Sequence, residues 1–155
     1  MQSTNWSAAI KASLIAGITF LVLELALVAT VGGESPWAPV RMIGAIALGQ
    51  DVLPPPATFD LTSFIAAAIV HFALAILYGG IFALVADRAG WGLGVSSIAG
   101  LAFGLILYAV NFYGFTALFP WFAMARNGIS IFAHAMFGLV LGFSYRKLAP
   151  YAVAA

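Results

Sequence analysis

Three side chains that can bind protons or metals stand inside long apolar runs: Glu24, His71 and His134. At 1.5 Å per residue, each lies roughly 18–24 Å along its helix from the charged residue at the helix end. We therefore expect all three at similar depths in one helical bundle. Ionisable groups at such depth usually face the bundle interior and pair with each other. The spacing thus predicts an intramembrane polar site in which Glu24 pairs with a histidine.

Several kinds of chemistry fit these residues. A neutral histidine can simply hydrogen-bond a neighbouring helix, whereas a carboxylate followed by imidazoles can relay protons or ions. His71 and His134 could instead bind one b-type haem from opposite sides. With Glu24 as a third ligand, the pair would suit zinc or copper. The sequence leaves these alternatives open, and any metal or cofactor is unknown.

Each histidine follows a similar motif. Residues 36–41 (Pro-Trp-Ala-Pro-Val-Arg) precede the segment that carries His71, and residues 120–126 (Pro-Trp-Phe-Ala-Met-Ala-Arg) precede His134. Small residues follow each histidine at the fourth and eighth positions. This repeat predicts two pseudo-symmetric halves, each made of two helices.

The two motifs place an aromatic ring and a cation near the ends of predicted helices. Trp37 with Arg41, and Trp121 with Arg126, fit an interfacial belt in which the arginines reach lipid headgroups. The alternative is that the arginines bind a lipid phosphate or a quinone carbonyl at the rim of a pocket.

Small residues at helical spacing predict where helices pack closely. Gly100 and Gly104 form a Gly-x-x-x-Gly pair, a pattern that lets helix backbones approach one another. The full set expected to serve helix packing is Ala75, Gly79, Gly100, Gly104, Gly138 and Gly142.

The composition is that of a membrane protein. Of the 155 residues, 64% are apolar and only 7% are charged, against roughly a quarter charged in soluble domains. Cysteine is absent, which excludes disulfides, thiolate metal sites, iron–sulfur clusters and covalently attached haem. A net charge of +1 with no basic cluster gives no reason to expect nucleic-acid binding.

Apolar runs predict an all-α, polytopic four-helix bundle in a single domain, 1–155. The expected spans are about 8–30, 62–85, 91–115 and 127–145, with a short interfacial helix at about 37–49. Basic residues near the span ends favour cytoplasmic N- and C-termini: Lys11, Arg88, Arg146 and Lys147 lie on that side, and Arg41 and Arg126 on the other. No hydrolase triad or phosphate loop is present, so we do not expect an enzyme.

The chain resembles the YagU-like family of bacterial inner-membrane proteins. The resemblance lies in the motif at 36–41 with Gly-Ala-Ile-Ala-Leu-Gly at 44–49, and again around His71, Tyr78 and Gly79, and around His134 and Gly138. It implies a multi-pass protein of the bacterial inner membrane and supplies no catalytic residues.

These features favour a non-enzymatic accessory subunit that packs against a larger membrane complex or against itself. Four short-looped spans barely enclose a pathway, and almost no mass projects from the bilayer. One alternative is a small proton-linked transporter or channel that uses Glu24, His71 and His134. The other is a bis-histidine haem protein. The expected partners are the lipid bilayer and other membrane chains.

Overall fold

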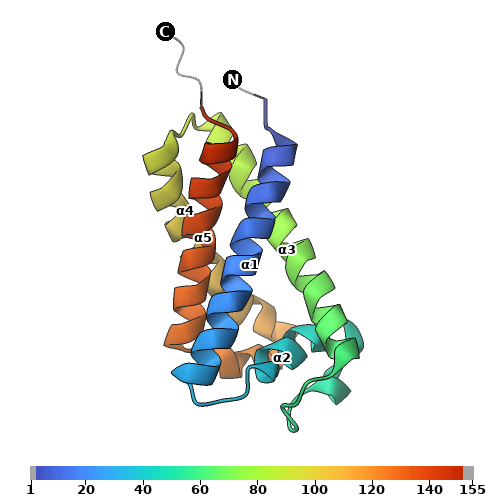
Figure 1. Cartoon of the computed structure of the whole chain (residues 1–155). Helices are drawn as coiled ribbons and strands as arrows, with labels where there is room; N and C mark the ends of the chain where they lie inside the picture. The colour runs from blue at the N-terminus through green and yellow to red at the C-terminus, as the bar shows by residue number, and fades with distance from the viewer. Residues whose placement is uncertain (1–2, 152–155) are drawn as a thin grey trace.

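The computed structural model describes residues 3–151, and within that range the chain is helical with no strand. Four segments are long and apolar enough to span a membrane: α1 (Trp6–Thr30), α3 (Leu61–Arg88), α4 (Leu93–Ala109) with the turns that extend it to Ala117, and α5 (Gly128–Leu148). The prediction of an all-α, four-helix, multi-pass architecture is therefore confirmed. The predicted domain also included residues 1–2 and 152–155, which lie outside the described range. The start of α1 and the end of α5 lie at the same end of the bundle (Figure 1).

Polar side chains fix the starts of three spans. Asn5, Asp60 and Asn127 each accept a hydrogen bond from the backbone N–H three residues later, at 3.0, 2.7 and 3.0 Å. Such caps satisfy a helix N–H that would otherwise lack a partner. The start of α3 is thus set by the side chain of Asp60.

The third span differs from the single helix expected over 91–115. Its α-helix ends at Ala109, and a wider π-helical turn, η2 (Val110–Gly114), and a 3-10 turn, η3 (Phe115–Ala117), follow. Such wide turns are frequent at functional sites, because they redirect side chains from the regular helix face. Here the turn carries Asn111 and Phe112.

The long helices form an open row in the order α4, α5, α1, α3. Helix α5 packs closely against both α4 and α1, and α1 packs against α3, whereas α3 and α4 barely touch. The repeat predicts that the contact of α1 with α5 is matched by one between α4 and α3. The packing therefore gives the pseudo-symmetric arrangement no support.

Glycine faces bring α4 and α5 together. A Cβ on Gly100 or Gly104 would overlap the backbone of α5, and a Cβ on Gly138 or Gly142 would overlap the backbone of α4. This contact of bare backbones lets many weak van der Waals interactions form along the pair, which is how helices associate in lipid. It fixes α4 against α5 near the level of the histidines.

A buried polar cluster fastens three helices near the chain ends. Arg146 of α5 forms an ion pair with Asp87 of α3 at 2.7 Å, and their side chains are only 1% and 3% exposed. Tyr145 donates to the same carboxylate, and Arg146 also donates to Ser96 of α4 at 3.3 Å. Asp87 and Arg146 thus lie inside the bundle and link its helices, although both stand near the ends of their spans.

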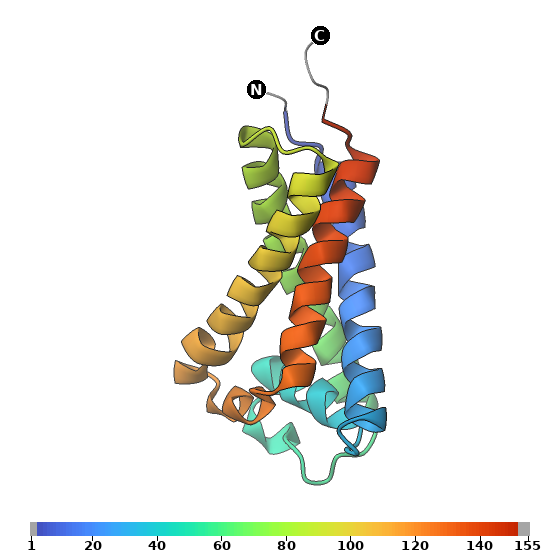
Figure 2. The same cartoon turned by 90° about the vertical axis from the view of Figure 1, so that its left-hand side faces the viewer.

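At the opposite end the helices spread apart. Helix α3 leaves α1 in one view, and α4 leaves α5 in the other (Figures 1 and 2). Helix α2 (Trp37–Leu48), which confirms the short helix expected at about 37–49, fills this end with the 3-10 turns η1 (Gln50–Val52) and η4 (Pro120–Ala125). The indole of Trp121 donates to the carbonyl of Met42 at 3.0 Å and ties η4 to α2.

Candidate functional site

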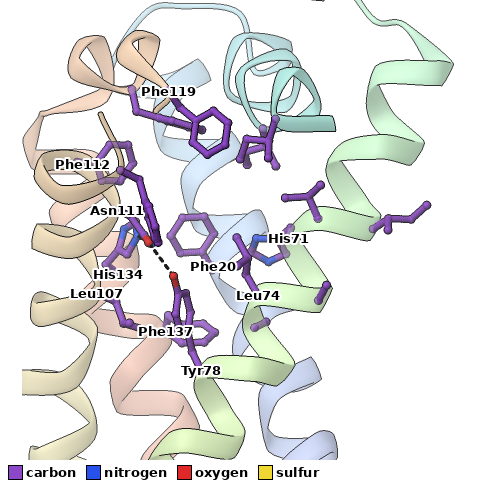
Figure 3. A pocket seen from close by; sticks show the side chains of 18 residues that line it. Phe20, His71, Leu74, Tyr78, Leu107, Asn111, Phe112, Phe119, His134 and Phe137 are labelled. Carbon is purple, nitrogen blue, oxygen red and sulfur yellow. Dashed lines mark hydrogen bonds between the residues drawn. The ribbon is translucent and has the colours of Figure 1, made fainter. Parts of the chain in front are cut away.

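A cavity of about 410 Å³ lies where α3 and α4 separate, and we call it the lateral cavity. Its lining comes from every long helix, from α2 and from η4 (Figure 3). Most of the lining is aliphatic or aromatic; the aromatic hydrocarbon rings are those of Phe20, Phe112, Phe115, Phe119, Phe122 and Phe137. The space exists because α4 packs on α5, α5 on α1 and α1 on α3, whereas α3 and α4 barely touch.

A hydrogen bond between two residues that line this cavity joins α3 to the turn after α4. The hydroxyl of Tyr78 on α3 donates to the side-chain oxygen of Asn111, which lies just beyond the end of α4, at 3.0 Å (Figure 3). The π-helical turn brings Asn111 to this position. Because α3 and α4 make almost no other contact, this bond is the main polar link between α3 and this part of the third span.

His134 is held from both sides in one hydrogen-bonding state. Its Nδ1 lies 2.7 Å from the carbonyl oxygen of Ser130, which can only accept, so Nδ1 carries the proton. Its Nε2 lies 3.3 Å from the side-chain nitrogen of Asn111, which can only donate. With Tyr78 donating to Asn111, the three side chains form one consistent chain around a neutral imidazole.

His71 is held differently, by the backbone of α1. Its Nε2 lies 3.0 Å from the carbonyl oxygen of Gly17 and must donate to it. The ring of Phe20 lies between the two histidines, 5.3 Å from the centre of His71 and 4.9 Å from that of His134 (Figure 3). The histidines therefore line one cavity without touching each other.

This arrangement does not fit a haem held by the two histidines. Both Nε2 atoms already have partners, and the Phe20 ring lies between the imidazoles. Nor do the residues come together as the predicted zinc or copper site: within residues 3–151 no group of three or more His, Asp or Glu side chains could hold a metal ion.

Glu24 does not pair with a histidine, so the expected pair is wrong. One carboxylate oxygen accepts a hydrogen bond from the Ser130 hydroxyl at 2.8 Å, and the other has no partner. Distance along each helix predicted that Glu24 and the histidines lie at the same depth. Which side chain binds Glu24, however, depends on the direction in which each side chain points. Ser130 stands one turn before His134 and takes the place that the histidine was expected to fill.

A second cavity, of about 510 Å³, lies beside Glu24 at the end of the bundle that α2 fills, and we call it the end cavity. Its walls come from the second half of α1, from Glu34 and Ser35 after it, from α2, from residues 54–57, from Phe112 and from η4 with the residues after it. Four residues line both cavities: Phe20, Ile43, Phe112 and Phe122. The two spaces are thus direct neighbours.

The arginines of the two motifs bind the protein's own loops. Arg41 donates to the carbonyl oxygens of Thr58 and Val52 at 2.8 and 3.2 Å. Arg126 donates to the carbonyl of Phe112 at 2.7 Å and to the hydroxyl of Thr116 at 3.1 Å. Both arginines therefore have partners within the protein, and a role for either of them at a lipid headgroup remains a prediction.

The two tryptophans also differ. Trp121 is buried against α2, whereas Trp37 is half-buried and packs against Phe59, with the ring centres 4.9 Å apart.

Of the predicted packing residues, Ala75 lies against Gly17 and Gly79 against Ser13, both between α3 and α1. The remaining four glycines lie between α4 and α5, as described above.

Four residues that shape the site were not predicted as site residues. Phe20 stands one turn before Glu24, and Ser130 one turn before His134, so both share a helix face with a predicted site residue. Tyr78 lies two turns beyond His71 on the same face, and Asn111 is the amide in the apolar run 91–115. Face-sharing and the lone amide were signals that could have identified them.

Searches of protein-family models, of curated proteins and of solved structures found no match to this chain. The resemblance to the YagU-like family therefore stays a prediction, and the function rests on the geometry of the site.

Proposed function

We propose that this protein is a non-enzymatic, multi-pass membrane protein that binds a lipid-soluble small molecule in the lateral cavity. The cavity itself carries the proposal, because a space of about 410 Å³ lies between two long helices that barely touch. Ligand pockets in proteins typically range over about 300–1,000 Å³ and are lined mainly by apolar and aromatic side chains, with a few polar groups that fix orientation.

The lining indicates the chemistry of the ligand. Aromatic rings surround it, and the polar side chains are those of His71, Tyr78, Asn111 and His134. Most of their N–H and O–H donors already have acceptors, so a ligand with many polar groups would leave some of its own groups unpaired. A largely apolar, ring-containing molecule with one or two hydrogen-bonding groups is favoured.

Entry from the bilayer requires little disruption of the fold. Opening the gap between α3 and α4 breaks the bond from Tyr78 to Asn111, and a typical hydrogen bond contributes about 0.5–1.5 kcal/mol. The glycine contacts of α4 with α5 need not change. A lateral route thus suits a molecule that dissolves in lipid.

Site-resolved photolabelling with an adamantyl diazirine tests the proposal in protein reconstituted into nanodiscs. We expect labels on the cavity residues Phe119 and Phe122 as well as on the lipid-facing surface. Leu74→Trp fills the cavity from α3 and should lower the cavity labels about tenfold, which corresponds to about 1.4 kcal/mol of binding. The matched control is Leu77→Trp, because Leu77 lies on α3, is 56% exposed and does not line the cavity.

Two results would contradict the proposal. One is wild-type protein labelled only on its outer surface. The other is an equal loss of cavity labels in Leu74→Trp and in its control, since the effect would then come from a general change of the fold.

A chain of polar contacts favours a second candidate, proton-linked transport. Ser130 donates to Glu24 through its hydroxyl and accepts from His134 through its carbonyl, and Asn111 continues the chain to Tyr78. His71 is not part of it. Proton flux into liposomes that is lost in Glu24→Gln and kept in His71→Gln would support this candidate.

We also propose, from the sequence, that the protein is an accessory subunit in a bacterial inner membrane with both termini cytoplasmic. A binding role and a subunit role are compatible, because a small bundle can present a lipid-soluble molecule to a larger complex. Purification in mild detergent tests this: a stoichiometric partner supports it, and a protein that is always recovered alone contradicts it.

A further inference from the structure

We infer that the ligand is a lipophilic organic cation, an ammonium or phosphonium amphiphile whose charged group lies beside Glu24 in the end cavity. The apolar body of the molecule would then occupy the lateral cavity. This inference rests on the proposed function, since it names the chemical class that the same site binds.

The first observation is an unpaired acid. Glu24 is only 6% exposed, and one of its carboxylate oxygens has no hydrogen-bond partner. Within residues 3–151 the ion pair joins Arg146 to Asp87, so Glu24 has no basic side chain that balances its charge. An ionised carboxylate in such a place is costly unless a cation or further donors approach it.

The second observation is the charge of the cavity wall. The end cavity is lined by two acidic residues, Glu24 and Glu34, and by no basic residue. Arg41 and Arg126 lie in the segments near this end but donate to backbone carbonyls and threonine hydroxyls, and neither lines the cavity. The wall therefore favours a cation over an anion.

The third observation is continuity between an acidic space and an aromatic one. Phe20, Phe112 and Phe122 line both cavities, and Phe20 stands one turn from Glu24. Aromatic faces attract organic cations, and the attraction is larger where water is excluded. A molecule with a cationic group and an apolar body can thus satisfy both spaces together.

Competition between two ions of the same shape and opposite charge tests the inference. Tetraphenylphosphonium and tetraphenylborate are added separately before photolabelling with the adamantyl diazirine, and the label on Phe122 is measured. We expect the cation to protect at about a tenfold lower concentration than the anion, after correction for partitioning into protein-free nanodiscs.

Three variants assign the preference to Glu24. Glu24→Gln should abolish it, whereas Glu24→Asp, which keeps the charge, should retain it. The control is Asp51→Asn, which removes an exposed acid near the same end that does not line the cavity. Equal protection by both ions in the wild type would overturn the inference without needing any variant, and so would a preference that survives in Glu24→Gln.

The failures of the two proposals can be told apart. If Phe122 is never labelled, the lateral cavity takes up no small molecule and the proposed function fails. If Phe122 is labelled but both ions protect it equally, the cavity binds ligands without regard to charge and only this inference fails.

Discussion

Among the acidic residues of the chain, Asp87 is the one whose removal should lower the free energy of unfolding most. In Asp87→Ala the guanidinium of Arg146 stays buried without its counter-charge, and the Tyr145 hydroxyl loses its acceptor. Breaking a buried ion pair typically costs about 3–5 kcal/mol. Because Arg146 lies near the end of α5 and its long side chain can move toward water, we expect the lower value, about 3 kcal/mol.

The free energy of unfolding can be measured by titrating sodium dodecyl sulfate into dodecyl maltoside micelles and following far-ultraviolet circular dichroism. A loss of about 3 kcal/mol lowers the ratio of folded to unfolded protein by more than about a hundredfold. Asp51→Ala is the matched control, since Asp51 is exposed and should change stability by no more than about 0.5 kcal/mol.

A double variant separates the ion pair from local packing. Asp87→Leu combined with Arg146→Met removes both charges, and replacing a whole buried pair by apolar side chains is often nearly neutral. We therefore expect the double variant to be more stable than Asp87→Ala. The reasoning would be refuted if Asp87→Ala cost less than about 1 kcal/mol, or if the double variant lost the sum of the two single effects.

Two further variants test the packing of α4 and the opening beside it. Gly138→Ala places a methyl group against the Gly100 carbonyl and should cost about 1–3 kcal/mol in the same titration, whereas Gly128→Ala, where a Cβ meets nothing, should not. Tyr78→Phe removes the bond to Asn111 and should speed cavity labelling by the diazirine while costing about 0.5–1.5 kcal/mol. Unchanged labelling would show that this bond does not control entry.

The sequence was sufficient to predict the helices, because long apolar runs with polar caps leave few alternatives in a membrane. The four spans and the short helix after the first lie close to their predicted places. The end of α4 was the main exception, since nothing in the run 91–115 distinguishes a π-helical turn from a regular helix.

The site was predicted less well than the helices, for a physical reason. Position along a helix gives depth, and it placed Glu24, His71 and His134 at one level. Partner choice depends on the rotation of each helix and on which neighbours it meets, and these follow from tertiary packing. Ser130 rather than a histidine therefore binds Glu24, and Phe20 separates the histidines.

The open side of the bundle also could not be predicted from the sequence. The repeat predicts two pseudo-symmetric halves, yet α4 packs on α5, α5 on α1 and α1 on α3, so the long helices form a row. The lateral cavity is a consequence of that row, because the small residues of α3 face α1 and those of α4 face α5.

The most direct test of the central claim is native mass spectrometry of the protein released gently from its own membrane, followed by identification of any bound small molecule. We expect one lipid-soluble molecule per chain in the wild type and in Leu77→Trp, and its loss in Leu74→Trp. A chain of bare mass in the wild type, or a bound molecule that Leu74→Trp retains fully, would contradict it.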